Sequence, residues 1–120
     1  MKVMIVDDSR AMRMIIKRTL RHAGFGNLQI IEAKDGHDAL EKHQAHGASI
    51  IISDWHMPGL DGGSLLKTLR ESGDNVPFGF VTTQSTAEMQ QRARDAGASF
   101  YVIKPVTVEA FQDQLGEFFQ

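Results

Sequence analysis

Five short apolar runs alternate with segments of helical periodicity along this sequence, and no hairpin signal separates one run from the next. Runs of this length suit strands, whereas apolar residues spaced three and four apart suit helices. Strands that are joined through helices form a parallel sheet with helices on both faces and right-handed crossovers. The sequence therefore predicts a single α/β domain over residues 1–120, with a five-stranded parallel sheet and five helices.

The expected strands are rich in β-branched and aromatic residues, which favour extended backbone. They comprise residues 2–6, 28–31, 50–52, 76–82 and 100–103. Residues 50–52 are three consecutive isoleucines, so this strand should be buried on both faces. Gly79 lies inside the fourth strand, where a glycine indicates that another element approaches the backbone closely.

Capping residues predict where the helices begin and end. Asp8 or Ser9 can cap the first helix. Residues 85–88, Ser-Thr-Ala-Glu, have the form of a capping box at the start of the fourth helix, which Gly97 ends. The last helix carries apolar residues at helical spacing almost to the end of the chain, although Gly116 within it is a poor helix former.

Composition excludes several classes of protein. Thirteen Lys and Arg residues against fifteen Asp and Glu give a net charge of −2 without a basic block, so direct nucleic-acid binding is not expected. The sequence has no cysteine, hence no sign of an oxidising compartment. No apolar run approaches the roughly 18 residues of a membrane span, and no signal-peptide pattern follows Met1. We therefore expect a cytoplasmic protein without a membrane segment.

Polar side chains follow four of the five expected strands at the point where each ends. Asp7 and Asp8 follow the first strand, Asp54 the third, Thr82 ends the fourth and Lys104 follows the fifth. The carboxyl ends of parallel strands meet at one edge of the sheet, which is where open α/β sheets bind ligands. We expect these five side chains to converge there.

Carboxylates brought together repel one another and ionise with difficulty unless a cation shares the site. An all-oxygen ligand set without thiol or imidazole favours Mg²⁺. The Thr82 hydroxyl and the Lys104 ammonium suit the remaining oxygens of a phosphoryl group. Asp54 is the candidate chemical centre, because a carboxylate can act as a nucleophile and form an acyl phosphate.

Each of these residues also has a structural explanation. Asp7 and Asp8 can cap a helix, and Asp54 can bond to the amides of a turn. Thr82 suits a strand, and Lys104 can lie along the surface with its charge in water. Their joint placement at one edge of the sheet favours a single functional site over five separate structural roles.

The motifs together resemble the receiver domain of two-component response regulators. They are the Asp7-Asp8 pair, Asp54 within Asp-Trp-His-Met-Pro-Gly-Leu-Asp-Gly, Thr82, and Lys104-Pro105. Among receiver domains, the segments around Asp7-Asp8 and Asp54 are most similar to those of the CheY group of chemotaxis regulators. The resemblance implies a doubly wound, flavodoxin-like sheet with strand order 2-1-3-4-5.

The resemblance also implies the chemistry. Asp54 would accept a phosphoryl group from a histidine kinase or from acetyl phosphate, and the domain would catalyse only its own phosphorylation and dephosphorylation. Mg²⁺ would be bound by Asp8, Asp54 and the main-chain carbonyl of His56, with Asp7 acting mainly through water.

The remaining implied roles concern switching. Thr82 and Lys104 would contact the phosphoryl oxygens, and the ring of Tyr101 would turn inward as Thr82 moves towards the phosphate. This movement would alter the surface formed by the fourth helix, fifth strand and fifth helix, where a partner binds. The partner would be the flagellar motor switch or an attached output domain, and the chain a monomer or weak dimer. The Lys104-Pro105 peptide bond is expected to be cis.

Thr83 and His56, which stands where an acidic or amide residue is commoner, depart from the commonest receiver pattern. Thr83 stands where the family usually has alanine or glycine, and can narrow the path to Asp54. His56 and Gln84 occupy the variable positions beside the attacking water, so all three are candidates for setting the lifetime of the phosphorylated form. An imidazole at His56 also gives the hypothesis that this lifetime depends on pH near neutrality. Trp55 is expected to cover the edge of the site.

Other functions fit the sequence less well. A phosphatase acting through an aspartyl intermediate, of the haloacid dehalogenase type, would need an Asp-x-Asp pattern after the first strand, which Val6-Asp7-Asp8-Ser9 lacks. A nucleotide binder would carry a phosphate-cradling loop there instead of two acids. A structural domain with a vestigial site is disfavoured by the complete set of five residues. A receiver cut from a longer regulator, and a regulator without an output domain, both remain compatible with the sequence.

Overall fold

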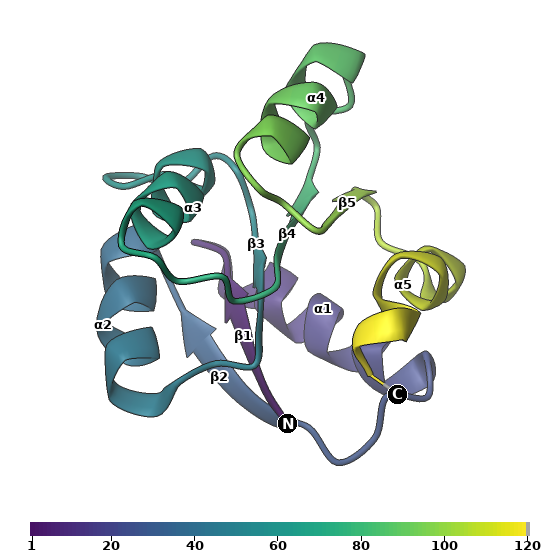
Figure 1. Ribbon diagram of the computed structural model, residues 1–120. Helices are drawn as coiled ribbons and strands as arrows, with labels where there is room; N and C mark the ends of the chain where they lie inside the picture. The colour runs from purple at the N-terminus through teal and green to yellow at the C-terminus, as the bar shows by residue number, and fades with distance from the viewer. Residues whose placement is uncertain (120) are drawn as a thin grey trace.

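A computed structural model describes residues 1–119, which form five strands, five α-helices and a short 3-10 helix (Figure 1). All strand pairs are parallel, and the sheet order is β2-β1-β3-β4-β5, which confirms the predicted doubly wound fold. The strands are β1 (Lys2–Val6), β2 (Gln29–Ala33), β3 (Ile50–Ser53), β4 (Phe78–Thr82) and β5 (Phe100–Ile103). The helices are α1 (Arg10–His22), α2 (Gly36–His46), α3 (Gly62–Glu71), α4 (Ala87–Asp95) and α5 (Val108–Leu115), followed by the 3-10 turn Gly116–Phe118.

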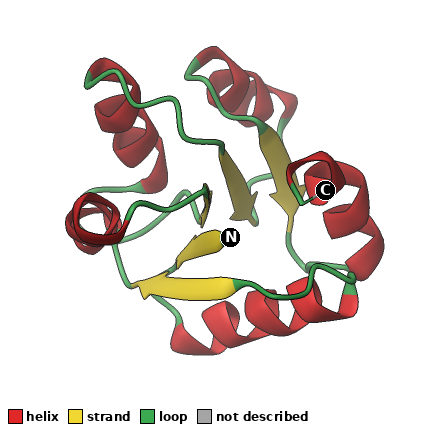
Figure 2. Cartoon of the chain, turned by 60° about the horizontal axis from the view of Figure 1, so that its bottom comes forward, coloured by secondary structure: helices red, strands yellow, loops and turns green. Residues whose placement is uncertain are grey.

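Helices cover both faces of the sheet, as the view along it shows (Figure 2). α2, α3 and α4 pack on one face through a core that includes Leu65, Leu66 and Phe80. α1 and α5 pack on the other face around Ile16 and Phe111. Because strands β1, β3 and β4 are sandwiched between these layers, almost all of their side chains are fully buried. Polar residues can therefore lie only where these strands end.

The boundaries of three strands differ from the prediction. β3 extends one residue further, to Ser53, which pairs with Val6, and β2 begins one residue later, at Gln29. β2 runs to Ala33 because its last residue pairs with Val6 at the end of β1. β4 begins at Phe78 rather than at Val76, since the Val76 N–H donates to the Asp74 side chain at 2.9 Å instead of entering the sheet. A side-chain acceptor competes with the strand ladder here, and periodicity alone does not reveal it.

Helix ends follow the predicted chemistry with small shifts. Ser9 is the N-cap of α1 and accepts the Met12 N–H, which resolves the choice between Asp8 and Ser9. Thr86, not Ser85, caps α4, so the predicted capping box was wrong by one residue. Either hydroxyl can accept the orphan N–H of a first helical turn, which is why the sequence did not distinguish them. α5 ends at Leu115, and the tighter 3-10 turn follows from Gly116.

The expected close approach at Gly79 is confirmed. A Cβ atom built on Gly79 would lie 2.2–2.3 Å from three atoms of the Phe100 ring on the neighbouring strand β5. Phe100 is itself buried, so its ring has little room to move. Glycine is thus required where β5 packs against β4, close to Thr82.

Replacing Gly79 with alanine is expected to lower the free energy of unfolding by about 1–3 kcal/mol, the usual cost of overpacking a core. The matched control is Gly116→Ala, because a Cβ there meets nothing within 4 Å and its backbone is already helical. That control should leave stability unchanged or raise it by about 0.4–1 kcal/mol. Urea denaturation of both variants tests this; equal stability of the two would contradict it.

Candidate functional site

Asp7 lies directly after β1 and each of its polar groups has a partner. Its main-chain N–H donates to the Ala33 carbonyl at 3.1 Å, one carboxylate oxygen accepts the Ser9 N–H at 2.9 Å, and the other accepts the Lys104 ammonium at 3.1 Å. The residue is 1% exposed. Asp7 is therefore a carboxyl group held in one position within the protein rather than a loosely held surface acid.

Asp54 follows β3 and is held in a similar way. Its N–H donates to the Val6 carbonyl at 2.9 Å, which continues the pairing of β3 with β1. Its carboxylate accepts the Trp55 N–H at 2.7 Å and the Lys104 ammonium at 3.0 Å. The Asp54 side chain is 13% exposed, so solvent reaches it from one side.

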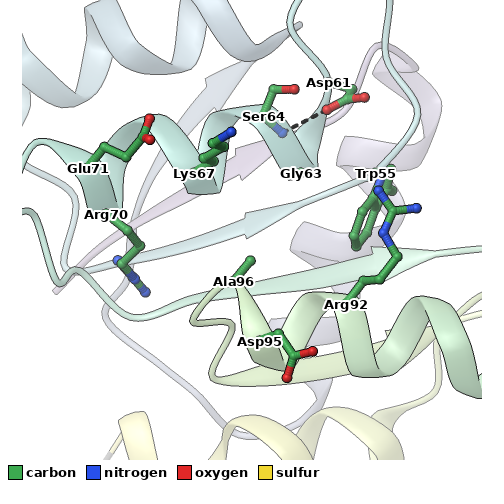
Figure 3. A pocket seen from close by; sticks show the side chains of 10 residues that line it. All are labelled: Trp55, Asp61, Gly63, Ser64, Lys67, Arg70, Glu71, Arg92, Asp95 and Ala96. Carbon is green, nitrogen blue, oxygen red and sulfur yellow. Dashed lines mark hydrogen bonds between the residues drawn. The ribbon is translucent and has the colours of Figure 1, made fainter.

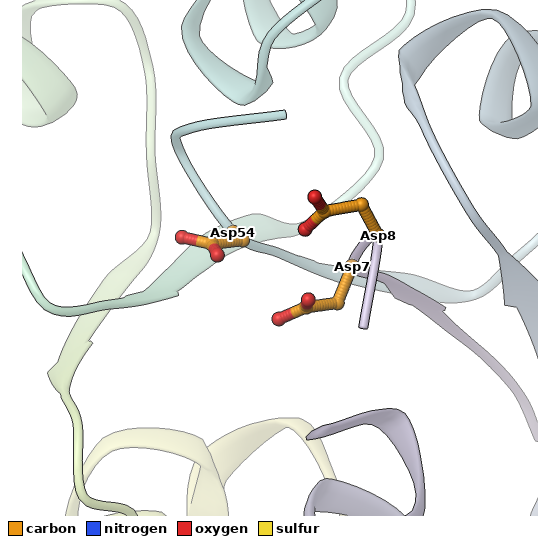
Figure 4. Close-up of side chains that lie close together, drawn as sticks. All are labelled: Asp7, Asp8 and Asp54. Atoms are coloured by element: carbon orange, nitrogen blue, oxygen red, sulfur yellow. The ribbon is translucent and has the colours of Figure 1, made fainter. Parts of the chain in front are cut away.

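Oxygen atoms of Asp7, Asp8 and Asp54 lie within 4.8 Å of one another. Figure 4 shows these three side chains grouped at the ends of two neighbouring strands. Asp8 is the exposed member of the cluster, Asp7 the buried one. The structure thus brings the predicted acids together at the carboxyl edge of the sheet.

The Lys104 ammonium bonds to both Asp7 and Asp54, and burial changes the pKa values within this cluster. Burial raises the pKa of Asp7, and the charge of Asp54 adds to this, whereas hydrogen bonds from Ser9 and Lys104 oppose it. Burial alone would lower the pKa of Lys104, but its bonds to Asp54 and Asp7 outweigh that effect and raise it. Lys104 is accordingly an ammonium ion whose charge is used within the site.

The cluster fits a hard divalent cation. Three carboxylates face one ammonium, so the site carries an excess of negative charge. All the candidate ligand atoms are oxygens, and one of the three acids is open to solvent, as Mg²⁺ requires because it keeps several of its waters.

Thr82 and Tyr101 are connected through the main chain of Gln84. Thr82 is fully buried, and its hydroxyl oxygen accepts the Gln84 N–H at 3.3 Å. The Tyr101 hydroxyl donates to the Gln84 carbonyl at 2.7 Å. Burial raises the pKa of Tyr101, and the negative charge of Asp54 adds to this. One residue therefore links the predicted switch pair in this structure.

The remaining predicted residues lie in the loops around the site. His56 is exposed, two residues beyond Asp54, and Thr83 is exposed beyond β4, whereas Gln84 is half-buried. The Lys104-Pro105 peptide bond is cis, and the Lys104 N–H donates to the Thr82 carbonyl at 2.8 Å.

Trp55 does not cover the site, contrary to our expectation. Its side chain is 6% exposed and stacks on Phe80 with ring centroids 4.5 Å apart. The Arg92 guanidinium also lies over the Trp55 ring, 5.5 Å from its centroid. Trp55 is one of the residues that line a groove of about 500 Å³ between α3 and α4 (Figure 3). The tight turn after β3 directs the indole into the core, away from the carboxylates.

Sequence reasoning missed Arg13. From α1, its guanidinium donates to the main-chain carbonyl of Asp7 at 2.6 Å and to the Glu32 carboxylate at 3.0 Å. A contact with a main-chain carbonyl leaves no trace in the pattern of side chains. The available signal was an arginine one helical turn beyond the N-cap of α1, on the side that faces β2.

Comparisons with known proteins agree with this arrangement. The family model described as "Response regulator receiver domain" matches residues 3–115. Chemotaxis protein CheY-3 of Vibrio cholerae is 37% identical over all of this chain and 92% of its own length. Chemotaxis protein CheY of Pseudomonas aeruginosa is 36% identical over all of this chain and 97% of its own. The solved structure of chemotaxis response regulator CheY4 of Vibrio cholerae has a TM-score of 0.83 and 32% identity, covering 98% of this chain and 97% of that one.

Mg²⁺ is expected to stabilise the protein through the three acids. At a free concentration ten times its dissociation constant, the free energy of unfolding should rise by about 1.4 kcal/mol. Asp8→Asn should reduce this gain, because it removes a ligand charge that solvent can reach. Asp113→Asn, an exposed acid on α5, is the matched control and should respond like the wild type. Thermal unfolding across a Mg²⁺ titration measures the effect, and an Asp8→Asn response equal to that of the control would contradict it.

Proposed function

This chain belongs to the response regulator receiver domain family, and from this premise we propose that it is a switch controlled by phosphorylation of Asp54. The observation that carries the proposal is the Lys104 ammonium bonded to both Asp54 and Asp7, beside the open carboxylate of Asp8. A cationic donor and a cation-binding acid cluster then flank one accessible nucleophile. We propose that residues 1–120 act as one such receiver unit.

The proposed transfer is a displacement at phosphorus. A carboxylate oxygen of Asp54 attacks the phosphorus atom of a histidine kinase's phosphohistidine, the P–N bond breaks, and the imidazole nitrogen leaves with the electron pair. With acetyl phosphate, a P–O bond breaks and acetate leaves. Lys104 and Thr82 are proposed to donate hydrogen bonds to the phosphoryl oxygens, so that both ends of the site share its charge.

The residues suited to hold Mg²⁺ are Asp8, Asp54 and the main-chain carbonyl of His56, with Asp7 acting through water. When bound, the ion supplies positive charge that offsets the negative charge developing on the transferred group. Asp7 is buried and already bonded to Ser9 and Lys104, which supports an indirect role for it. In this proposal the protein catalyses only its own phosphorylation and dephosphorylation.

The proposed switch runs from Thr82 to Tyr101. A phosphoryl group on Asp54 attracts the Thr82 hydroxyl, which then leaves the Gln84 N–H that it accepts at 3.3 Å. Movement of Gln84 releases the Tyr101 hydroxyl from the Gln84 carbonyl. The phosphoryl group thereby biases a two-state surface of α4, β5 and α5, by an amount equal to its differential contacts in the two states.

The biological partners are proposed from the relatives. The two curated relatives are named chemotaxis proteins, which supports a chemotaxis role with a histidine kinase upstream and the flagellar motor switch downstream. Control of an attached output domain is the alternative, because the match to the receiver domain family is compatible with both. The chemotaxis role and the control of an output domain predict the same chemistry at Asp54. They differ only in what binds the surface of α4, β5 and α5.

Intact-mass measurement after incubation with acetyl phosphate and Mg²⁺ tests the phosphoacceptor. The wild type should gain the mass of one phosphoryl group, and a chelator should prevent the gain. Asp54→Asn should gain nothing, whereas the exposed control Asp113→Asn should react like the wild type. A gain on Asp54→Asn, or turnover of unrelated phosphate esters, would contradict the proposal and favour an enzyme.

His56, Thr83 and Gln84 are proposed to set how long the phosphoryl group persists, because they lie in the loops that border Asp54. The decay of the phosphorylated mass after donor removal, compared between the wild type and an alanine variant at each position, measures this role. Decay rates equal to that of the wild type in all three would exclude it.

The switch is tested by separating phosphorylation from its structural effect. Thr82→Ala should still accept a phosphoryl group on Asp54, yet phosphorylation should no longer change amide hydrogen exchange in residues 84–103. Thr82→Ser keeps the hydroxyl and should retain the change. If Thr82→Ala responded like Thr82→Ser, the path through the Thr82 hydroxyl would be wrong.

A further inference from the structure

Arg13 of α1 makes two hydrogen bonds that connect the acidic site to strand β2. Its Nη1 donates to the Asp7 carbonyl at 2.6 Å and its Nε to the Glu32 carboxylate of β2 at 3.0 Å. The Arg13 side chain is 14% exposed, so it is fixed within the protein. Arginine suits this position because its planar group presents several donors in a rigid fork.

The bond to Asp7 acts on Asp8 through the peptide group they share. The direction of the Asp7 carbonyl defines the plane of the Asp7–Asp8 peptide bond, since that bond is planar. The Asp7 N–H is bonded to Ala33 and its side chain to Ser9 and Lys104, so the carbonyl that Arg13 bonds is the remaining polar group of the residue. Once Arg13 holds that carbonyl, the backbone from which the exposed Asp8 carboxylate projects is fixed.

Lys17 provides an internal comparison. It lies one turn further along α1 and also bonds to Glu32, at 3.2 Å through the other carboxylate oxygen. It has the same charge as Arg13, but Asp7 is bonded by Arg13 and not by Lys17 in the described residues 1–119. The two residues therefore separate the effect of a positive charge near the site from the effect of holding the Asp7 carbonyl.

We propose that Arg13 is a positioning residue for the divalent-cation site, acting through the Asp7 carbonyl on the placement of the Asp8 carboxylate. The inference deepens the proposed function and rests on it. The direction in which Mg²⁺ affinity changes when Arg13 is removed distinguishes this positioning role from a simple effect of charge. A nearby positive charge repels Mg²⁺, so removing Arg13 would strengthen cation binding if charge were all that mattered, whereas loss of positioning weakens it.

The experiment compares Mg²⁺ dissociation constants of the wild type, Arg13→Gln, Arg13→Lys and Lys17→Gln by calorimetry. Arg13→Gln should bind Mg²⁺ on the order of ten-fold more weakly, as is typical when a group that orients a metal ligand is lost. Lys17→Gln should bind as the wild type does or slightly more tightly. Arg13→Lys, which keeps the charge but not the fork, should fall between Arg13→Gln and the wild type.

A second measurement works without metal. The Ser9 N–H donates to the Asp7 carboxylate at 2.9 Å, so its hydrogen exchange reports on the order of the Asp7–Ser9 backbone. Exchange at Ser9 should be faster in Arg13→Gln than in Lys17→Gln. Should Arg13→Gln fail to fold, Arg13→Lys is compared with the wild type in both measurements.

The proposal is overturned if Arg13→Gln binds Mg²⁺ as well as Lys17→Gln does, or more tightly. It is also overturned if Ser9 exchange is the same in the two variants. A wild type that takes up neither Mg²⁺ nor a phosphoryl group would instead refute the proposed function, and Ser9 exchange would still decide whether Arg13 orders this backbone.

Discussion

The structure depends on the confinement of three carboxylates around one ammonium ion at the carboxyl edge of the sheet. Strand β3 and all of β1 after Lys2 are buried, so Asp7 and Asp54, which follow these strands, cannot move into solvent without breaking the strand pairing. The main-chain N–H of Asp7 donates to Ala33 and that of Asp54 donates to Val6, and these two bonds fix the backbone of each acid. Lys104 offsets part of the charge and leaves an excess that a divalent cation can neutralise. The fold thus holds an excess of negative charge that a bound divalent cation would offset before a phosphoryl group adds more.

The same confinement connects this charge to the edge of the sheet. Lys104 and Thr82 end adjacent strands, and the Lys104 N–H donates to the Thr82 carbonyl. In the proposed mechanism, the two donors to a phosphoryl group on Asp54 therefore have backbones that are bonded to each other. Gln84 extends the connection to Tyr101 on the edge strand β5. The path from the acids to the outer surface is short because it follows strand ends rather than crossing the core.

Much of this arrangement could be predicted because parallel sheets leave a clear pattern in sequence. Buried strands read as apolar runs, and polar residues at their ends must share an edge, so Asp7, Asp54 and Lys104 could be brought together without coordinates. The burial of the Trp55 ring in the core could not be predicted in this way, because it depends on the backbone path after β3 rather than on residue type. The contact of Arg13 with the Asp7 carbonyl was equally hidden, since a main-chain acceptor is present at every residue.

The helices around the sheet differ in how firmly they are held, and this difference bears on where a switch can act. α1 is fixed to β2 through Arg13 and Lys17, and to α5 by the Gln112 side chain, which donates to the Ala23 carbonyl. α3 buries Leu65, Leu66 and Leu69, whereas α4 buries Ala93. Segments with little buried apolar surface open most easily. A charge added at Asp54 should therefore move the α4 side of the molecule, while α1 stays in place and keeps the Asp7–Asp8 backbone ready for the next cation.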